Sequence, residues 1–160
     1  MADTQRIAQR IAKIALDERG LVRRGPQVEH ERKAAIYDLI EENSFAVAGH
    51  EGPYDLRLGV EENRLMFDVR AEGGAELTRF ALPLAPFKTI VRDYFTICES
   101  YYSAIKTATP SKIEAIDMGR RGLHNEGAAL LRERLAEKAE IDDGTSRRLF
   151  TLLCVLHIRA

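Results

Sequence analysis

The fold is decided by residues 87–127, FKTIVRDYFTICESYYSAIKTATPSKIEAIDMGRRGLHNEG. The first half of this stretch places apolar side chains at helical spacing over about five turns. The members of the stripe are Phe87, Ile90, Val91, Tyr94, Cys98, Tyr101 and Ile105. We therefore expect a long helix over 86–108 whose apolar face is covered by another part of the chain. Thr109 and Pro110 end it, because proline starts a helix more readily than it continues one.

The last nine residues of the stretch contain the densest group of glycine and polar residues in the chain. If this segment is helical, Arg120 and His124 lie on one side, with Arg121 about a quarter-turn away. If Gly122 instead ends one helix, Asn125 caps the next and leaves backbone N–H groups free. Either arrangement suits a phosphate or a carboxylate, since arginine binds both through paired hydrogen bonds. The predicted ligand-binding residues are Arg120, Arg121, His124 and Asn125.

A purely structural interpretation accounts for the same segment. Ala115, Gly119 and Gly122 are small residues at helical spacing, which let a neighbouring helix approach closely. Arg120 and Arg121 then form ordinary ion pairs with acidic residues nearby in the sequence. The available partners are Asp117, Glu114 and Glu126. The sequence leaves this interpretation open beside the ligand site.

The residues before this stretch predict a strand, a helix and a series of strands. Residues 7–16 fit both a helix and a strand, and we prefer the strand because the segment after it is rich in glycine and arginine. Pro26 begins a helix that ends near Asn43. A short strand over 44–48 follows.

An antiparallel meander comes next. Residues 54–61 alternate strictly between apolar and polar, and 65–70 repeat the pattern after a turn. Residues 72–74, Glu-Gly-Gly, predict a hairpin turn, since glycine reaches positive φ without penalty. A last strand ends near Pro83. The meander has one apolar and one polar face, and we expect the 86–108 helix to cover the apolar one.

After Pro110 the pattern predicts a helix interrupted at Gly119 or Gly122, because each internal glycine costs about 1 kcal/mol relative to alanine. Residues 142–145 predict a turn and a cap, and 149–156 a final helix with almost no polar face. The order of elements indicates an α+β fold in a single domain spanning 1–160. It consists of a small antiparallel β-meander packed against a long helix, with a mostly helical C-terminal half.

Composition excludes several classes of protein. The chain has 160 residues, a 45% hydrophobic and 31% charged composition and a net charge of −1, which gives no general attraction to nucleic acid. Arg147 and Arg148 belong to a basic C-terminal segment, for which we prefer a solvated surface to the alternative of a phosphate-binding surface. Cys98 and Cys154 lie in apolar patterns and indicate a reducing cytoplasm. No apolar run is long enough for a membrane span, and the start does not resemble a signal peptide.

Motifs for metals, cofactors and nucleophiles are missing from the sequence. His30 has no second histidine at the spacing of a zinc motif. No phosphate-binding loop, dinucleotide glycine pattern or nucleophile elbow occurs. Glu29 and His30 remain able to join a site built by another element. We therefore predict no metal and no cofactor.

Several long segments resemble a small uncharacterised protein family of alphaproteobacteria. They are His30-Glu31-Arg32 with 36–45, 91–95 with 97–102, 110–127, and 147–157. The loops around 25–27 and Gly144 depart from the family pattern. The resemblance implies a cytoplasmic bacterial protein with a strand before its first helix. It implies no activity, so no catalytic residue is transferred from it.

The sequence thus predicts a binding or regulatory module for an anionic ligand or an acidic partner protein. One alternative is a small enzyme, a hydrolase or transferase, in which His124 is the acid or base and Arg120 and Arg121 stabilise negative charge. Asp117 or Glu126 would orient its imidazole. The other alternative is a homo-oligomeric interaction protein. A hollow beside His124 is required by the first two hypotheses and not by the third.

Overall fold

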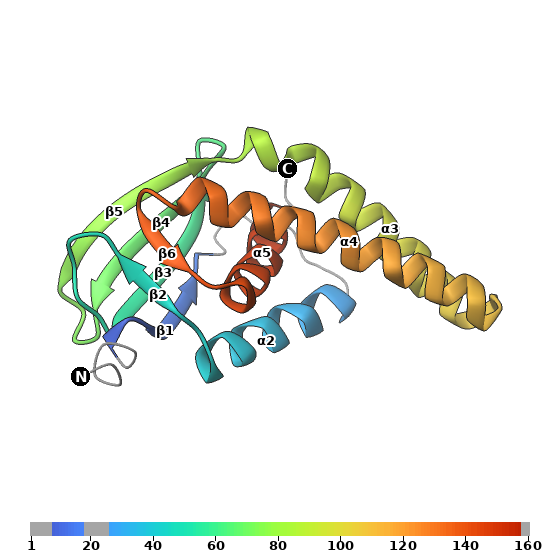
Figure 1. Ribbon diagram of the computed structural model, residues 1–160, viewed down its shortest axis with the longest axis horizontal. Helices are drawn as coiled ribbons and strands as arrows, with labels where there is room; N and C mark the ends of the chain where they lie inside the picture. The colour runs from blue at the N-terminus through green and yellow to red at the C-terminus, as the bar shows by residue number, and fades with distance from the viewer. Residues whose placement is uncertain (1–7, 18–25, 158–160) are drawn as a thin grey trace.

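The computed structural model describes residues 8–17 and 26–157 (Figure 1). Strand β1 (Ile11–Leu16) confirms the preference for a strand, and helix α2 (Pro26–Glu41) begins at the predicted proline. Asn43 joins the two elements. Its Oδ1 accepts from the Ile11 backbone N–H at 2.7 Å, and its Nδ2 donates to the Ile11 carbonyl at 2.9 Å and to the Leu39 carbonyl at 2.7 Å. The side-chain amide thus replaces a strand partner for β1 and ends α2.

The predicted meander is present as β3 (Tyr54–Glu61), β4 (Arg64–Ala71) and β5 (Glu76–Pro83), with antiparallel neighbours. Glu62 and Asn63 turn the chain between β3 and β4 at φ of 52° and 59°. Two consecutive left-handed residues are typical of a tight hairpin whose twist matches that of its strands. Strand β1 adds to β3 in parallel, which gives a four-stranded sheet in the order β1-β3-β4-β5.

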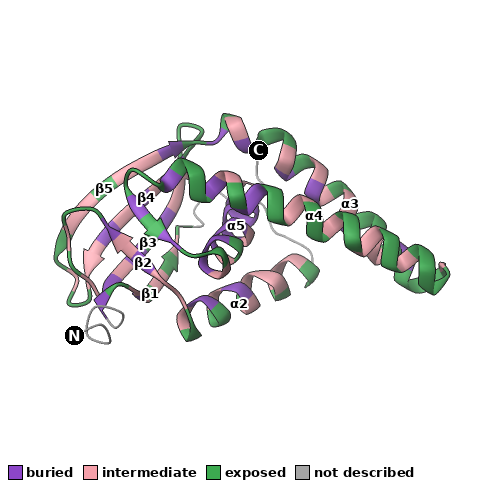
Figure 2. Ribbon diagram, viewed as in Figure 1, coloured by how far each residue is buried: buried purple, intermediate pink, exposed green. Residues whose placement is uncertain are grey.

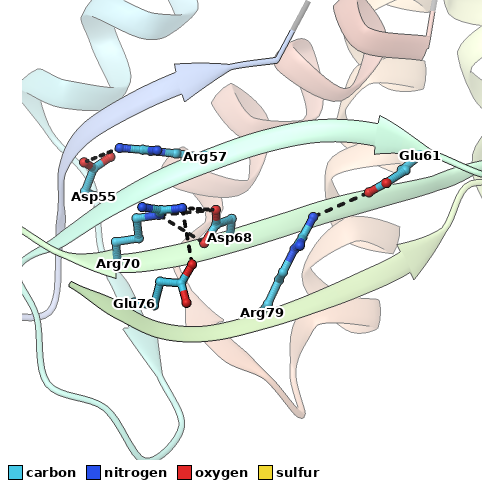
Figure 3. A network of polar contacts seen from close by, with 7 residues as sticks. All are labelled: Asp55, Arg57, Glu61, Asp68, Arg70, Glu76 and Arg79. Carbon is cyan, nitrogen blue, oxygen red and sulfur yellow. Dashed lines mark hydrogen bonds and ion pairs between the residues drawn. The ribbon is translucent and has the colours of Figure 1, made fainter. Parts of the chain in front are cut away.

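The outward face of this sheet is polar, as the alternation predicts. Figure 3 shows ion pairs on this face, some within a strand and some between strands. Arg70 Nη2 lies 3.1 Å from Asp68 Oδ2 and 3.5 Å from Glu76 Oε1. Arg79 Nη2 lies 3.5 Å from Glu61 Oε2. Opposite charges on facing strands stabilise the pairing, and the apolar side chains are left for the other face.

The short strand predicted over 44–48 is β2 (Phe45–Val47), but it lies outside the meander. It pairs antiparallel with β6 (Ala139–Ile141), a strand that the sequence did not predict. The two form a separate two-stranded sheet next to α5 (Asp143–His157). Asp142 caps α5 by accepting from the Thr145 N–H at 2.9 Å, which confirms the predicted cap.

Helices α3 (Lys88–Thr107, after the short 3-10 turn Ala85–Phe87) and α4 (Pro110–Leu135) form a long hairpin (Figure 1). The predicted interruption of α4 at Gly119 or Gly122 is wrong, since the helix runs unbroken through both. The cost of a glycine is small compared with the packing of a helix along a neighbour. The Thr109 side chain caps its start by accepting from the Lys112 N–H.

Helix α5 is the central helix of the molecule. Its buried side chains contact the sheet, and α2 and α4 pack around it (Figures 1 and 2). The 3-10 turn adds Phe87 to the same core, and the long helix α3 adds Val91 and Tyr94. Its distal half extends with α4 beyond the sheet and is largely exposed (Figure 2). The apolar face of the meander is therefore covered by α5 together with the first turns of α3. The α+β fold with a helical C-terminal half is confirmed.

Candidate functional site

A groove of about 540 Å³ lies between α2, α4 and α5, and we call it the α2–α4–α5 groove. This volume is in the range of small-molecule sites. All four residues that the sequence predicted as ligand-binding line it from α4, namely Arg120, Arg121, His124 and Asn125. The other lining residues are Glu31, Ala34, Ala35 and Asp38 of α2, Tyr94 of α3, and Arg147, Arg148 and Thr151 of α5. The hollow beside the imidazole that two of the hypotheses require is present.

His124 forms the inner wall of the groove. Its Nε2 lies 2.8 Å from Thr151 Oγ1, and its ring packs against Tyr94 and Phe150 with centroid distances of 5.3 and 5.2 Å. Burial lowers the pKa of His124 to about 4, and the positive charges of Arg147 and then Arg120 contribute to the same shift. The imidazole is therefore neutral at pH 7, where one ring nitrogen donates a hydrogen bond and the other accepts one.

Arg120 and Arg121 share one carboxylate. Asp117 Oδ1 accepts from Arg120 Nη2 at 2.6 Å, and Asp117 Oδ2 accepts from Arg121 Nη2 at 2.6 Å. These hydrogen bonds, that from Arg120 first, hold the pKa of Asp117 below its usual value. Arg120 also stacks on the Tyr101 ring, 4.1 Å from its centroid. The ion pairs of the structural interpretation thus exist beside the groove and fix the orientation of both guanidinium groups.

Asn125 is exposed on α4 and lines the outer part of the groove. The alternative in which it caps a new helix after Gly122 is wrong, because α4 is continuous there. The groove accordingly contains no free helix N-terminus from α4. Any anion bound near Asn125 meets side chains rather than backbone N–H groups.

The sequence favours solvated surface over a phosphate-binding surface for Arg147 and Arg148. In the structure both line the groove from α5. Arg147 is exposed at the rim, and Arg148 Nη1 donates to the Glu42 carbonyl at 2.8 Å. The only signal in the sequence was the basic bias of the C-terminal segment. Thr151 lies one turn after Arg147. No feature of the sequence marked it as a site residue, because its contact with His124 depends on the packing of α5 against α4.

Helix α2 supplies the acidic side of the groove through Glu31 and Asp38. Glu31 Oε1 accepts from the Tyr102 hydroxyl at 2.7 Å. Burial first, and then this hydrogen bond and the charge of Glu31, raise the pKa of Tyr102. The sequence left Glu29 and His30 able to join such a site, but neither lines this groove; the neighbouring Glu31, which the sequence did not single out, does.

The geometry changes what His124 can do in the enzyme hypothesis. The hydrogen bond that orients its ring comes from Thr151; within residues 8–17 and 26–157 neither Asp117 nor Glu126 takes that role. Since the imidazole is neutral at pH 7, it starts as a base or a hydrogen-bond donor and not as an acid. The proposal that Asp117 or Glu126 orients it is therefore wrong.

Other polar centres in the described part of the chain offer less. Cys98 and Cys154 are buried free thiols, and burial raises the pKa of Cys98 to about 11, so it is not a reactive thiolate. A hollow of about 1270 Å³ lies along β1 and β3, but its arginines pair with the acids of the sheet (Figure 3). Among the described residues no helix is both long and apolar enough to cross a membrane.

Comparison with known proteins places the chain. Residues 8–159 match the model of an uncharacterised protein family, UPF0262. A UPF0262 protein of Paramagnetospirillum magneticum is 61% identical over 152 residues, which cover 94% of this chain and 97% of the relative. One from Rhodospirillum rubrum is 60% identical over 146 residues, 91% of each chain.

A Bradyrhizobium relative with the same family name is 59% identical over 150 residues, covering 92% of this chain and 89% of its own. No solved structure matches the chain. The family resemblance noted in the sequence is thereby confirmed, and the relatives' names state no activity. With a family model that covers all but the ends and relatives of about 60% identity, the chain belongs to the uncharacterised protein family UPF0262.

Proposed function

We propose that this protein binds a small anionic ligand, bearing a phosphate or a carboxylate, in the α2–α4–α5 groove. The supporting observation is that four arginines from two helices, Arg120, Arg121, Arg147 and Arg148, line the same groove as the neutral imidazole of His124. A single exposed arginine is ordinary, but four around one hollow create a local positive potential in a protein of net charge −1.

The pKa of His124 is lowered first by burial and then by part of this positive potential. After burial, its main causes are the charges of Arg147 and Arg120, which make a further positive charge unfavourable at the imidazole. The same potential favours a negative charge at that position. An anion would find guanidinium groups together with one neutral donor from the hydrogen-bonded pair of His124 and Thr151, and this combination suits phosphate and carboxylate oxygens.

The arginines have different roles in this proposal. Arg120 and Arg121 are held by Asp117, so an anion competes with that carboxylate for them. Arg147 is exposed at the rim and its charge reaches His124, so it is the residue on which anion affinity depends most. The enzyme, the acidic partner protein and the homo-oligomer stay predictions that no contact in the structure favours over a small ligand.

Isothermal titration calorimetry with inorganic phosphate and with citrate, at low ionic strength and pH 7.5, tests the proposal. We expect saturable binding of at least one anion, and Arg147→Gln to weaken it about tenfold, as the loss of one charge-assisted hydrogen bond does. Arg134→Gln, an exposed arginine on α4 outside the groove, is the matched control and should leave affinity unchanged. Absence of binding, or equal losses in both variants, would refute the proposal.

A further inference from the structure

The α2–α4–α5 groove has walls of opposite charge. The wall formed by α4 and α5 carries four arginines, whereas the wall formed by α2 carries Glu31 and Asp38. Ala34 and Ala35 lie between these two acids on the same face of α2, because residues at i, i+3, i+4 and i+7 share one side of a helix. The small alanines leave space where a longer side chain would fill the groove.

Glu31 is placed to receive a positively charged or hydrogen-bond-donating group. Its side chain is half-buried, and one oxygen accepts from Tyr102 at 2.7 Å. A carboxylate offers about four acceptor positions, and among residues 8–17 and 26–157 the structure shows Tyr102 occupying one of them. Its charge also contributes to the raised pKa values of Tyr94 and Cys98, deeper in the protein. The negative potential of the α2 wall is therefore felt inside the fold and not only in solvent.

A simple anion would satisfy only one of the two walls of this groove. Bound to the arginines, it would also face the carboxylates of Glu31 and Asp38, and like charges at short range disfavour binding. A molecule with a negative group at one end and an ammonium group at the other satisfies both walls. Glu31 and Asp38 are separated by two turns of α2, about 10 Å at 1.5 Å per residue, so the acidic wall accommodates a ligand of several heavy atoms.

We propose that the ligand of the α2–α4–α5 groove is zwitterionic, with a phosphate or carboxylate bound by the arginines of α4 and α5 and an amine bound by Glu31. This inference rests on the proposed anion site and specifies the chemistry of its second half. Asp38 is exposed at the open side of the same wall and assists Glu31 through its charge. Such a ligand is an amino acid-like or amino-phosphate metabolite, and we expect it to bind more tightly than inorganic phosphate.

Two ligands of matched size test the amine contact separately from the anion contact. Phosphoethanolamine carries a phosphate and an ammonium group, and n-propyl phosphate replaces that ammonium by a methyl group. We expect the unmodified protein to bind phosphoethanolamine about tenfold more tightly, in line with one charge-assisted contact. Glu31→Gln should remove this preference while binding of n-propyl phosphate is retained or strengthened.

Control variants distinguish a failure of the amine contact from a failure of the anion site. Glu41→Gln changes an exposed acid of α2 outside the groove and should keep the full preference. Asp38→Asn, which removes no hydrogen bond of Tyr102, serves as a second variant if Glu31→Gln unfolds by circular dichroism. Equal affinity for the two ligands, with Arg147→Gln still weakening both, would overturn the zwitterion proposal and leave the anion site standing. Failure of both ligands to bind would overturn both.

Discussion

Thr151 Oγ1 lies 2.8 Å from His124 Nε2, so a hydroxyl of α5 fixes the orientation of an imidazole on α4. The two helices also meet where the Ser146 hydroxyl donates to the Ala128 carbonyl. Polar contacts at two levels thus hold α4 and α5 in one register. The positions of the four groove arginines depend on this register, because all four lie on α4 and α5.

The first prediction concerns acid stability. The pKa of His124 is about 4 in the fold against an ordinary 6.5, so between these values the unfolded chain binds more protons and folding weakens as the pH falls. We expect the free energy of unfolding to fall by about 1–2 kcal/mol from this residue between pH 7 and pH 5. Urea denaturation at both pH values measures it.

His124→Gln should flatten this dependence, because glutamine does not titrate. His157, whose pKa is also lowered by burial, contributes in the same direction, so some pH dependence remains in the variant. An unchanged loss of stability between pH 7 and pH 5 in His124→Gln would contradict the assignment. His50→Gln is the control, since this loop histidine lies outside the groove.

The second prediction concerns the shared carboxylate. Asp117→Asn removes the negative charge that Arg120 and Arg121 now share, and both guanidinium groups become more available. Affinity for inorganic phosphate should rise about fivefold, as expected for one partly screened ion pair. Glu114→Gln, an exposed acid on the same helix, should change it little. Weaker phosphate binding in Asp117→Asn would show that Asp117 mainly positions the arginines.

The third prediction uses two glycines of α4 that differ in their surroundings. A Cβ at Gly127 would overlap the Phe150 ring, whereas nothing lies within 4 Å of a Cβ at Gly122. Gly127→Ala should destabilise the protein by about 1–3 kcal/mol through overpacking. Gly122→Ala should stabilise it by about 0.5–1 kcal/mol, because alanine is the better helix former. Thermal unfolding of the pair checks both signs, and two changes of the same sign would contradict the packing described.

The fourth prediction tests Asn43, whose side chain pairs with both backbone groups of Ile11. Ile11 is fully buried, so its N–H and carbonyl would lose their partners in Asn43→Ala. We expect a loss of about 2 kcal/mol or more in the free energy of unfolding. The control is Asn125→Ala at an exposed asparagine, which should stay within about 0.5 kcal/mol of the parent. Similar effects of the two substitutions would mean that Asn43 is not structural.

Periodic elements were predictable from the sequence because their signals are local. The alternation over 54–61 and the stripe from Phe87 to Ile105 each repeat often enough to specify an element and its buried face. β6 has only three residues and is a strand because it pairs with β2, about ninety residues earlier in the chain. Nothing in its own composition therefore identifies it. The role of α5 in covering the sheet was not predictable for the same reason. The sequence contains two apolar helices that could each cover the sheet, and periodicity does not show which of them does.

The candidate site was predictable only on one helix. Arg120, Arg121, His124 and Asn125 follow one another closely, so their grouping is visible in the sequence. Glu31 and Arg147 reach the same groove from positions more than a hundred residues apart, and only the packing of α2 and α4 around α5 brings them together. The break expected at Gly122 failed because propensity near a glycine is weaker than tertiary packing.

Helix α5 both anchors the hydrophobic core and lines the groove. Phe150 and Leu153 are buried and anchor the helix in the core, while Arg147 and Thr151, one turn apart, line the groove. A change in the hydrophobic interior that shifts α5 by a fraction of a turn would therefore re-aim these polar side chains. The proposed anion affinity is therefore coupled to the packing of the core, and we expect core substitutions next to α5 to change that affinity before they unfold the sheet.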